Sequence, residues 1–220
     1  MSNNVNSPSK WERDYQRGEA GWDMGTPTPV FQRLLREGAL GTGALGTSAL
    51  ENAPYAVEFP PGRMLVPGAG RGHDAREFAR HGFEVVAVDF APGAVDAMRK
   101  ALTPETTHEI WQGDLFQLPA AWNETFDYVL EYTCLCALDP RRRGEYADTM
   151  ARVLKRGGKY IALAFPTSGF TGDPPFLVNA AELRALMEQR GLKLLYREIP
   201  SDSIKPRKGR EELLVMSNDV

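Results

Sequence analysis

The pattern of hydrophobic and polar positions changes near residue 63 of this chain. From there on, short apolar, β-branched runs alternate with segments whose apolar residues recur at helical spacing. The runs predict seven strands, at residues 63–66, 84–88, 108–112, 126–131, 159–165, 193–199 and 211–216. Helices are predicted between them, at residues 74–81, 91–102, 141–154 and 180–190, and the pair Gly157-Gly158 is expected to stop the third of these. This alternation predicts an α/β fold, a three-layer sandwich around a mostly parallel sheet.

The residues before this core follow no such alternation. Residues 10–35 are aromatic and charged, and Pro27 and Pro29 predict a turn followed by a helix that begins near Pro29. Residues 38–48 read GALGTGALGTS, a short duplication that we interpret as a tolerated loop insertion without chemistry.

These patterns predict how the chain is divided. We expect a disordered N-terminus at residues 1–9 and a single domain at residues 10–220. Within that domain, residues 10–50 form an N-terminal segment that contains the glycine-rich insertion, and residues 51–220 form the α/β core.

Composition and charge narrow the class of protein. A chain of 220 residues can bury one core without disulfides or metals, and its formal net charge of −3 argues against a nucleic-acid partner. No apolar run approaches a membrane span, so we expect no membrane partner and a cytoplasmic protein. A disulfide between Cys134 and Cys136 would be strained, and two thiols with three histidines make a poor zinc site. We therefore expect both cysteines to be packing residues in a reduced compartment, and no metal.

A glycine-rich turn, VPGAGRG at residues 66–72, joins the first core strand to the first core helix. Backbone N–H groups and a helix N-terminus face a ligand at such a turn, and glycines let the ligand approach closely. Dinucleotide sites require G-x-G-x-x-G, whereas Gly68, Gly70 and Gly72 give G-x-G-x-G and residue 73 is histidine. The spacing therefore argues against an NAD-dependent oxidoreductase.

Acidic residues follow the next two strands. Asp89 ends the second strand, where a carboxylate can accept hydrogen bonds from ribose hydroxyls, a feature that NAD enzymes share. Gly113, Asp114 and Leu115 follow the third strand. Ligand-type residues at three successive strand ends predict a nucleotide-containing ligand at this edge of the sheet.

Several motifs resemble one family. The G-x-G-x-G turn is similar to motif I of class I methyltransferases, which use S-adenosylmethionine. Trp11-x-x-x-Tyr15, GWDMGTP at residues 21–27, LVPGAGRGHDA, GDLF, EYTCLCALDPRRRGEYADTMARVLKRGGKYIALAFP and PRKGREELL resemble the thiopurine methyltransferase family. Within it, the similarity is greatest to the plant and bacterial thiol and halide methyltransferases, and it extends over residues 11–214.

The resemblance implies a Rossmann-like class I methyltransferase fold with a seven-stranded sheet, S-adenosylmethionine as the cofactor and S-adenosylhomocysteine as the product. It implies that the glycine loop holds the methionine part, that Asp89 binds the ribose and that Asp114 binds the adenine. It also implies that N-terminal aromatic side chains cover the cofactor, where cation–π attraction suits a sulfonium. The cofactor-binding residues so implied are Trp11, Tyr15, Trp22, Gly68, Gly70, Gly72, Asp89, Phe90, Asp114, Leu115 and Tyr132. Tyr15 stands where the branch usually has tryptophan, and tyrosine can also stack.

The acceptor side is implied by two residues. Tyr132 stands where mammalian thiopurine enzymes have arginine and the thiol and halide branch has tyrosine, which argues against thiopurines as the natural substrate. Arg207 stands where family members place a basic residue near the substrate, and residues 166–176 are expected to form a loop over it. We assign Tyr132 and Arg207 substrate-orienting roles. A monomer is the expected state.

The chemistry requires no evident catalytic histidine. A thiol with a pKa of ~8.5 is already a few per cent thiolate at neutral pH, and a halide or pseudohalide needs no base. His73, His81 and His108 are therefore expected to be structural. The leading hypothesis is methyl transfer to a small soft nucleophile, namely a thiol, sulfide, thiocyanate, halide or thiopurine. An O- or N-methyltransferase of a specialised metabolite and a non-catalytic S-adenosylmethionine-binding module remain alternatives.

Overall fold

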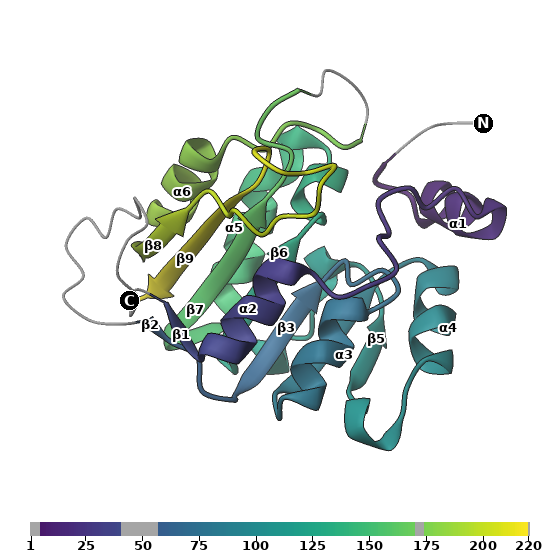
Figure 1. Ribbon diagram of the computed structural model, residues 1–220, viewed down its shortest axis with the longest axis horizontal. Helices are drawn as coiled ribbons and strands as arrows, with labels where there is room; N and C mark the ends of the chain where they lie inside the picture. Colours follow the sequence, from purple (N-terminus) through teal and green to yellow (C-terminus); the bar gives the residue numbers. More distant parts are fainter. Residues whose placement is uncertain (1–4, 41–56, 170–173, 220) are drawn as a thin grey trace.

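The computed structural model describes residues 5–40, 57–169 and 174–219, which form a seven-stranded sheet with helices on both faces (Figure 1). The strands of this sheet are β3 (Arg63–Pro67), β4 (Glu84–Asp89), β5 (Glu109–Gln112), β6 (Phe126–Tyr132), β7 (Leu154–Ala164), β8 (Leu192–Glu198) and β9 (Glu212–Asn218). The α-helices in the described ranges are α1 (Pro8–Arg17), α2 (Pro29–Glu37), α3 (His73–Arg80), α4 (Pro92–Lys100), α5 (Arg143–Val153) and α6 (Ala180–Glu188). The expected α/β three-layer fold is therefore confirmed.

The strands lie in the order β5-β4-β3-β6-β7-β9-β8. Neighbours from β5 to β7 pair in parallel, whereas β9 runs antiparallel to both β7 and β8, so the expected mostly parallel sheet is confirmed. The chain moves from β3 to β4 and β5 on one side and then returns to place β6 on the other side of β3. Such a reversal opens a crevice at the carboxyl ends of the strands, which is where ligands bind in open α/β sheets.

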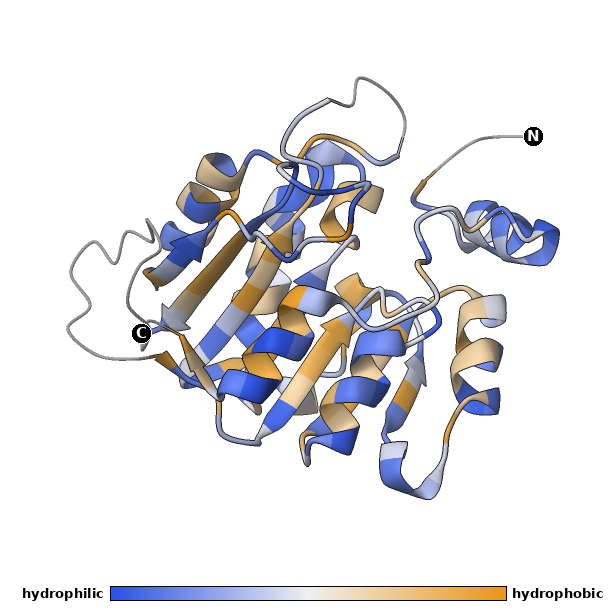
Figure 2. Cartoon of the chain, in the orientation of Figure 1, coloured by the Kyte–Doolittle hydropathy of each residue, from blue (hydrophilic) through white to orange (hydrophobic). Residues whose placement is uncertain are grey.

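Both faces of the sheet are apolar and covered. In β3, Met64 and Val66 point to the face covered by α2 and α3, whereas Leu65 points to the face covered by α5 and α6. Figure 2 shows that hydrophobic positions continue along the central strands and the inner sides of these helices. Burial on two faces explains why the strands appear in the sequence as near-continuous apolar runs.

The N-terminal segment contains two helices, of which one was predicted. Helix α2 begins at Pro29 as expected, but α1 begins at Pro8, inside the segment 1–9 that we expected to be disordered. The duplicated GALGT segment lies largely in residues 41–56, outside the described residues. On either side of it, β1 (Ala39–Leu40) pairs antiparallel with β2 (Val57–Glu58).

The expected role of the glycine pair at 157–158 is wrong. Helix α5 ends at Val153, and both glycines lie inside β7, where the register against β6 shifts. Gly157 has a φ of 75°, and a Cβ on Gly158 would lie 3.0 Å from the Phe126 carbonyl oxygen. The glycines therefore permit an irregular strand that passes close to its neighbour. In the sequence alone, such a glycine pair cannot be distinguished from one that ends a helix.

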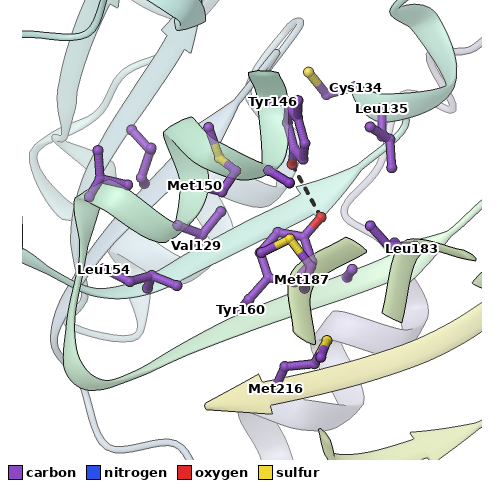
Figure 3. Close-up of a cluster of buried hydrophobic side chains, with 14 of the residues drawn as sticks. Val129, Cys134, Leu135, Tyr146, Met150, Leu154, Tyr160, Leu183, Met187 and Met216 are labelled. Atoms are coloured by element: carbon purple, nitrogen blue, oxygen red, sulfur yellow. Dashed lines mark hydrogen bonds between the residues drawn. The ribbon is translucent and has the colours of Figure 1, made fainter. Parts of the chain in front are cut away.

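A buried carboxylate fixes the end of β6. Glu131 is 2% exposed, and its Oε1 accepts from the Leu135 backbone N–H at 2.8 Å while its Oε2 accepts from the Tyr146 hydroxyl at 2.6 Å. Tyr146 lies 3.3 Å from the Tyr160 hydroxyl, as Figure 3 shows within the surrounding apolar cluster. Burial raises the pKa of Glu131 to about 7, although these hydrogen bonds partly oppose the shift. Strand β6, helix α5 and the turn after β6 are thus joined by one side chain.

This raised pKa predicts how stability depends on pH. Glu131 titrates near pH 7 in the folded protein and near 4.5 in the unfolded chain, so its contribution is present below about pH 4.5 and is lost as the pH rises through 7. Glu131→Gln cannot titrate, and between pH 5 and 7 its free energy of unfolding should fall less steeply than that of the wild type, by up to about 1.4 kcal/mol per pH unit. Urea denaturation at pH 5, 6, 7 and 8 measures this difference. Glu145→Gln, an exposed position on α5, should keep the wild-type slope; parallel profiles for Glu131→Gln and wild type would contradict the assignment.

Candidate active site

Left-handed glycines shape the turn between β3 and α3. Gly68, Gly70 and Gly72 have φ values of 57°, 58° and 69°, a region that other residues occupy only at a cost. A Cβ on Gly68 would lie 2.7 Å from the Cys134 Sγ, and one on Gly70 would lie 3.1 Å from the Tyr15 hydroxyl. The turn therefore needs glycine both for its backbone and for the close approach of its neighbours.

Gly72 differs from the other two glycines in its surroundings. It is the N-cap of α3, and a Cβ there would lie 2.8 Å from the Met98 Cγ. It does not line the cavity described next. The structure thus separates Gly72 from the ligand-facing surface where sequence reasoning placed it.

A cavity of about 710 Å³ lies at the carboxyl edge of the sheet. Every other residue predicted to bind the cofactor or orient the acceptor lines it: Trp11, Tyr15, Trp22, Gly68, Gly70, Asp89, Phe90, Asp114, Leu115, Tyr132 and Arg207. Residues from positions 11 to 207 therefore meet at one site, and its volume suits a ligand of nucleoside size together with a small second molecule.

Two acidic side chains occupy the ends of β4 and β5. Asp89 is 8% exposed, and its two carboxylate oxygens accept from the backbone N–H groups of Gly70 and Ala91, both at 2.9 Å. Burial raises its pKa to about 6, while these hydrogen bonds act in the opposite direction. Asp114 accepts from the Phe116 N–H at 3.0 Å. Each carboxylate oxygen can accept more than one hydrogen bond, so both acids retain capacity for ligand hydroxyl or amino groups.

Aromatic side chains from the N-terminal segment form one wall. The Trp22 ring meets Trp11 and Tyr15 edge to face, with centroids 5.3 and 5.7 Å apart. Helix α1 is attached to the core because the Gly93 N–H donates to Glu12 Oε2 at 2.6 Å. Burial, with the nearby Asp89, raises the pKa of Tyr15, so its hydroxyl stays protonated over the glycine loop.

Asp23, which sequence reasoning did not single out as a site residue, connects this segment to the glycine loop. Its carboxylate lies 3.1 Å from Arg71 Nε and 3.0 Å from His73 Nε2. Burial lowers the pKa of His73 although Asp23 opposes the shift. His73 lines the cavity, but its ring is held between Asp23 and Arg76. His81 and His108 bond to backbone oxygens and do not line the cavity. These contacts agree with structural roles for all three histidines.

A second part of the cavity wall is built around a buried guanidinium. Arg207 is 5% exposed, its Nη2 donates to the Trp22 carbonyl oxygen at 2.7 Å, and its Nη1 donates to the Tyr132 hydroxyl. Its guanidinium also lies 4.6 Å from the centroid of the Phe165 ring. In the loop predicted at 166–176, Pro174 and Pro175 line the cavity, whereas residues 170–173 lie outside the described residues.

Two further acids, one buried and one partly exposed, support this wall, and sequence reasoning did not identify either. The Tyr132 hydroxyl donates to Glu211, which is 2% exposed. Asp74 accepts from the Thr28 backbone N–H at 2.7 Å and from its hydroxyl at 2.9 Å, joining α3 to the start of α2. A charged residue in an otherwise apolar run is a weak signal for such a role, because most of these residues are simply exposed.

Both cysteines line the cavity as free, buried thiols. Burial raises the pKa of Cys136 to about 12 and that of Cys134 well above its usual value. They are therefore protonated near neutral pH. Both are free and buried, as expected for packing residues, and they also line the cavity.

Other kinds of site are not found in the described ranges. Residues 5–40, 57–169 and 174–219 contain no group of three or more His, Cys, Asp or Glu side chains arranged to hold a metal. No helix within these ranges is long and apolar enough to cross a membrane.

Comparisons with known proteins agree with this geometry. Residues 48–219 match the family description "Thiopurine S-methyltransferase (TPMT)". The chain is 32% identical to "Probable thiol methyltransferase 2" of Arabidopsis thaliana, over 94% of this chain and 84% of that protein. It is 29% identical to "Thiocyanate methyltransferase 1" of Brassica oleracea, over 92% of this chain and 82% of that protein.

A solved structure resembles the fold. The 1,6-didemethyltoxoflavin-N1-methyltransferase of Burkholderia thailandensis, with bound 1,6-didemethyltoxoflavin and S-adenosylhomocysteine, superposes with a TM-score of 0.69 at 19% identity. The superposition covers 97% of this chain and 87% of that one. The arrangement of layers is therefore that of class I methyltransferases.

The buried carboxylate of Asp89 can be tested by ligand binding. Asp89→Ala should weaken S-adenosylhomocysteine binding by ~1.5–3 kcal/mol, the usual range for hydrogen bonds to a charged acceptor. Because protonation near pH 6 removes the charge, the affinity of the wild type should also fall between pH 7 and 5, and that of the variant should change less. Isothermal titration calorimetry measures both effects. Asp96→Ala, an exposed side chain on α4, is the control; an unchanged dissociation constant for Asp89→Ala would show that Asp89 does not contact the ligand.

The aromatic wall predicts a second binding effect. Trp22→Ala removes the ring that both Trp11 and Tyr15 contact. The dissociation constant for S-adenosylmethionine should therefore rise, because the lost cation–π attraction alone weakens the binding free energy by ~0.5–2 kcal/mol. The loss should be smaller for S-adenosylhomocysteine, whose sulfur carries no charge. Equal affinities of variant and wild type for both ligands would limit the aromatic residues to packing.

Proposed function

Because the chain belongs to the thiopurine S-methyltransferase family, we propose that it transfers the methyl group of S-adenosylmethionine to the sulfur, or a comparably soft atom, of a small acceptor. The chain is an S-adenosylmethionine-dependent methyltransferase by family and by fold. One observation carries the proposal: a single cavity joins the glycine loop and its acids to a mostly apolar wall that contains Tyr132 and Arg207. Donor and acceptor can therefore meet within it.

The proposed cofactor contacts follow the walls of this cavity. Asp89, with Phe90 beside it, binds the ribose hydroxyls, and Asp114 with Leu115 binds the adenine. The backbone of the turn at Gly68 and Gly70 faces the methionine part, while Cys134 and Tyr15 pack where the Cβ atoms of these glycines would lie. Gly72 supports this turn from the far side.

On the cofactor's other side, Trp11, Tyr15 and Trp22 cover the sulfonium. Their rings already form a packed, edge-to-face group, so little ordering is needed when the ligand binds. The pairing of Asp23 with Arg71 and His73 holds this cover against the glycine loop.

The cofactor supplies an activated methyl group and its own leaving group. The residues of the chain therefore contribute mainly alignment and exclusion of water, and well-oriented intramolecular reactions reach effective molarities of ~10⁵–10⁸ M. Tyr132 and Arg207 orient the acceptor from the side opposite the glycine loop. Phe31 and Phe165 provide apolar surface there, which suits a polarisable, weakly hydrated atom better than a strongly hydrated oxygen.

The acceptor class also rests on the relatives. Proteins named for thiol and thiocyanate methylation match over more than nine-tenths of this chain, so thiols, sulfide and thiocyanate are the first acceptors to test, followed by halides and thiopurines. We further propose that the protein acts as a cytoplasmic monomer on small molecules, not on nucleic acids.

A turnover screen tests this function. Purified protein and S-adenosylmethionine are combined with a thiol, sulfide, thiocyanate, iodide and a thiopurine, and methylated product is detected by mass spectrometry. We expect product from at least one thiol, sulfide or thiocyanate, and smaller or no turnover with the thiopurine. Tight S-adenosylhomocysteine binding without turnover of any acceptor would identify a non-catalytic binding module, and turnover of oxygen or nitrogen nucleophiles alone would also refute S-methylation.

A further inference from the structure

The hydroxyl of Tyr132 has a defined direction. Its O–H donates to Glu211 Oε1, so its proton is directed toward Glu211, and Arg207 Nη1 donates to its oxygen. A hydroxyl oxygen has two acceptor positions, of which Arg207 occupies one. Within the described part of the chain, Tyr132 therefore keeps one acceptor position and no donor for a ligand in the cavity.

Glu211 is placed to receive a proton. It is buried behind Tyr132, and burial raises its pKa above the ordinary value, partly opposed by the Ser203 and Tyr132 hydroxyls and by the charge of Arg207. The neighbouring charge of Asp202 acts in the same direction as burial, and Asp202 is itself paired with Arg33 on α2 at 2.9 Å. A carboxylate with a raised pKa is a stronger proton acceptor than an exposed one.

A small second void lies next to Tyr132 and Glu211. It has a volume of about 10 Å³, on the order of one water, and both Tyr132 and Glu211 line it. Met24, which is 42% exposed, also lines it, so the void lies next to the protein surface. Tyr132 thus borders both the active-site cavity and a small void that Glu211 also lines.

We propose that Tyr132 and Glu211 form a proton relay that deprotonates a neutral thiol acceptor, with Tyr132 touching the acceptor and Glu211 receiving the proton behind it. This inference deepens the proposed function and rests on it. It also separates acceptors into two groups, because thiols and hydrogen sulfide carry a proton that must leave whereas thiocyanate and halide ions do not.

The step balances within the active site. The thiol sulfur keeps the electron pair of its S–H bond and forms a bond to the methyl carbon, whose bond to the sulfonium sulfur breaks with its electrons left on that sulfur. The thiol proton moves to the Tyr132 oxygen, and the proton of Tyr132 moves to Glu211. Tyr132 ends neutral, and Glu211 ends as a neutral acid that loses its proton to water before the next turnover.

The size of the effect follows from thiol ionisation. A thiol of pKa ~8.5 is ~3% ionised at pH 7, so a complete relay can raise the reactive fraction by at most ~30-fold. Without the relay, the rate should follow the thiolate concentration and rise about tenfold per pH unit up to pH ~8.5.

Glu211→Gln tests the relay, because glutamine keeps the size of the side chain and cannot accept the proton. We expect kcat/KM at pH 7 to fall about 10- to 30-fold for a thiol whose pKa is near that of cysteine, and to change less than twofold for thiocyanate. The loss for the thiol should disappear as the pH approaches the thiol pKa. Glu212→Gln, whose side chain pairs with Arg197 on β8, is the matched control and should retain wild-type rates for both acceptors. Equal losses for thiol and thiocyanate, or no loss for either, would overturn the relay.

Calorimetry with S-adenosylhomocysteine gives a readout independent of turnover. Glu211→Gln should bind it with a dissociation constant within twofold of the wild type, which shows that the fold and cofactor site are intact. If that binding is lost, Tyr132→Phe decides instead, since it removes only the oxygen: a loss confined to thiols supports the relay, and an equal loss for thiocyanate overturns it. A wild-type protein that methylates none of the acceptors refutes the proposed function, whereas one that methylates thiocyanate or iodide but no thiol refutes only the relay.

Discussion

The buried guanidinium of Arg207 connects segments that meet only in the folded chain. It donates to the carbonyl of Trp22 and to the hydroxyl of Tyr132. One side chain therefore joins the N-terminal aromatic segment, the end of β6 and the loop before β9. A buried cation requires such partners, because an unpaired one is strongly destabilising. The positions of these three segments around the cavity therefore depend on one another through Arg207.

Local patterns account for the part of the protein that was predicted. The alternating runs predicted the sheet and its flanking helices, and the glycine spacing with Asp89 and Asp114 predicted one wall of the site, because each of these signals lies within a few residues of a strand end. The contacts of Asp23, Asp74 and Glu211 span 46 or more residues and depend on packing between elements, which single-residue patterns do not encode. The roles of Gly72 and of the pair at 157–158 were not predicted for a similar reason. A glycine in the sequence indicates that the backbone can adopt a special conformation, but it does not indicate which residues pack against it.

The carboxylates of the site differ in function because they differ in surroundings. Glu131 is fully enclosed by β6, α5 and the following turn, and its hydrogen bonds are all to the protein, so it fixes the floor behind the cavity. Asp89 is also buried but lines the cavity, and Glu211 is separated from the cavity by Tyr132, to which it is hydrogen-bonded. In each case burial raises the pKa, and the available hydrogen-bond partners determine whether the group supports structure, ligand binding or proton movement.

The two walls of the cavity come from different kinds of backbone. Apart from the N-terminal aromatic residues, the cofactor wall consists of strand ends and the turns that follow them, whereas Phe165, Pro174 and Pro175 belong to the connection after β7 and Arg207 to the one before β9. Long connections accept substitutions and insertions more readily than the sheet beneath them. Acceptor preference can therefore diverge among descendants of one ancestral gene while donor recognition is inherited unchanged, and a library randomised only in the connection after β7 would alter selectivity while keeping Arg207 and its bond to Trp22.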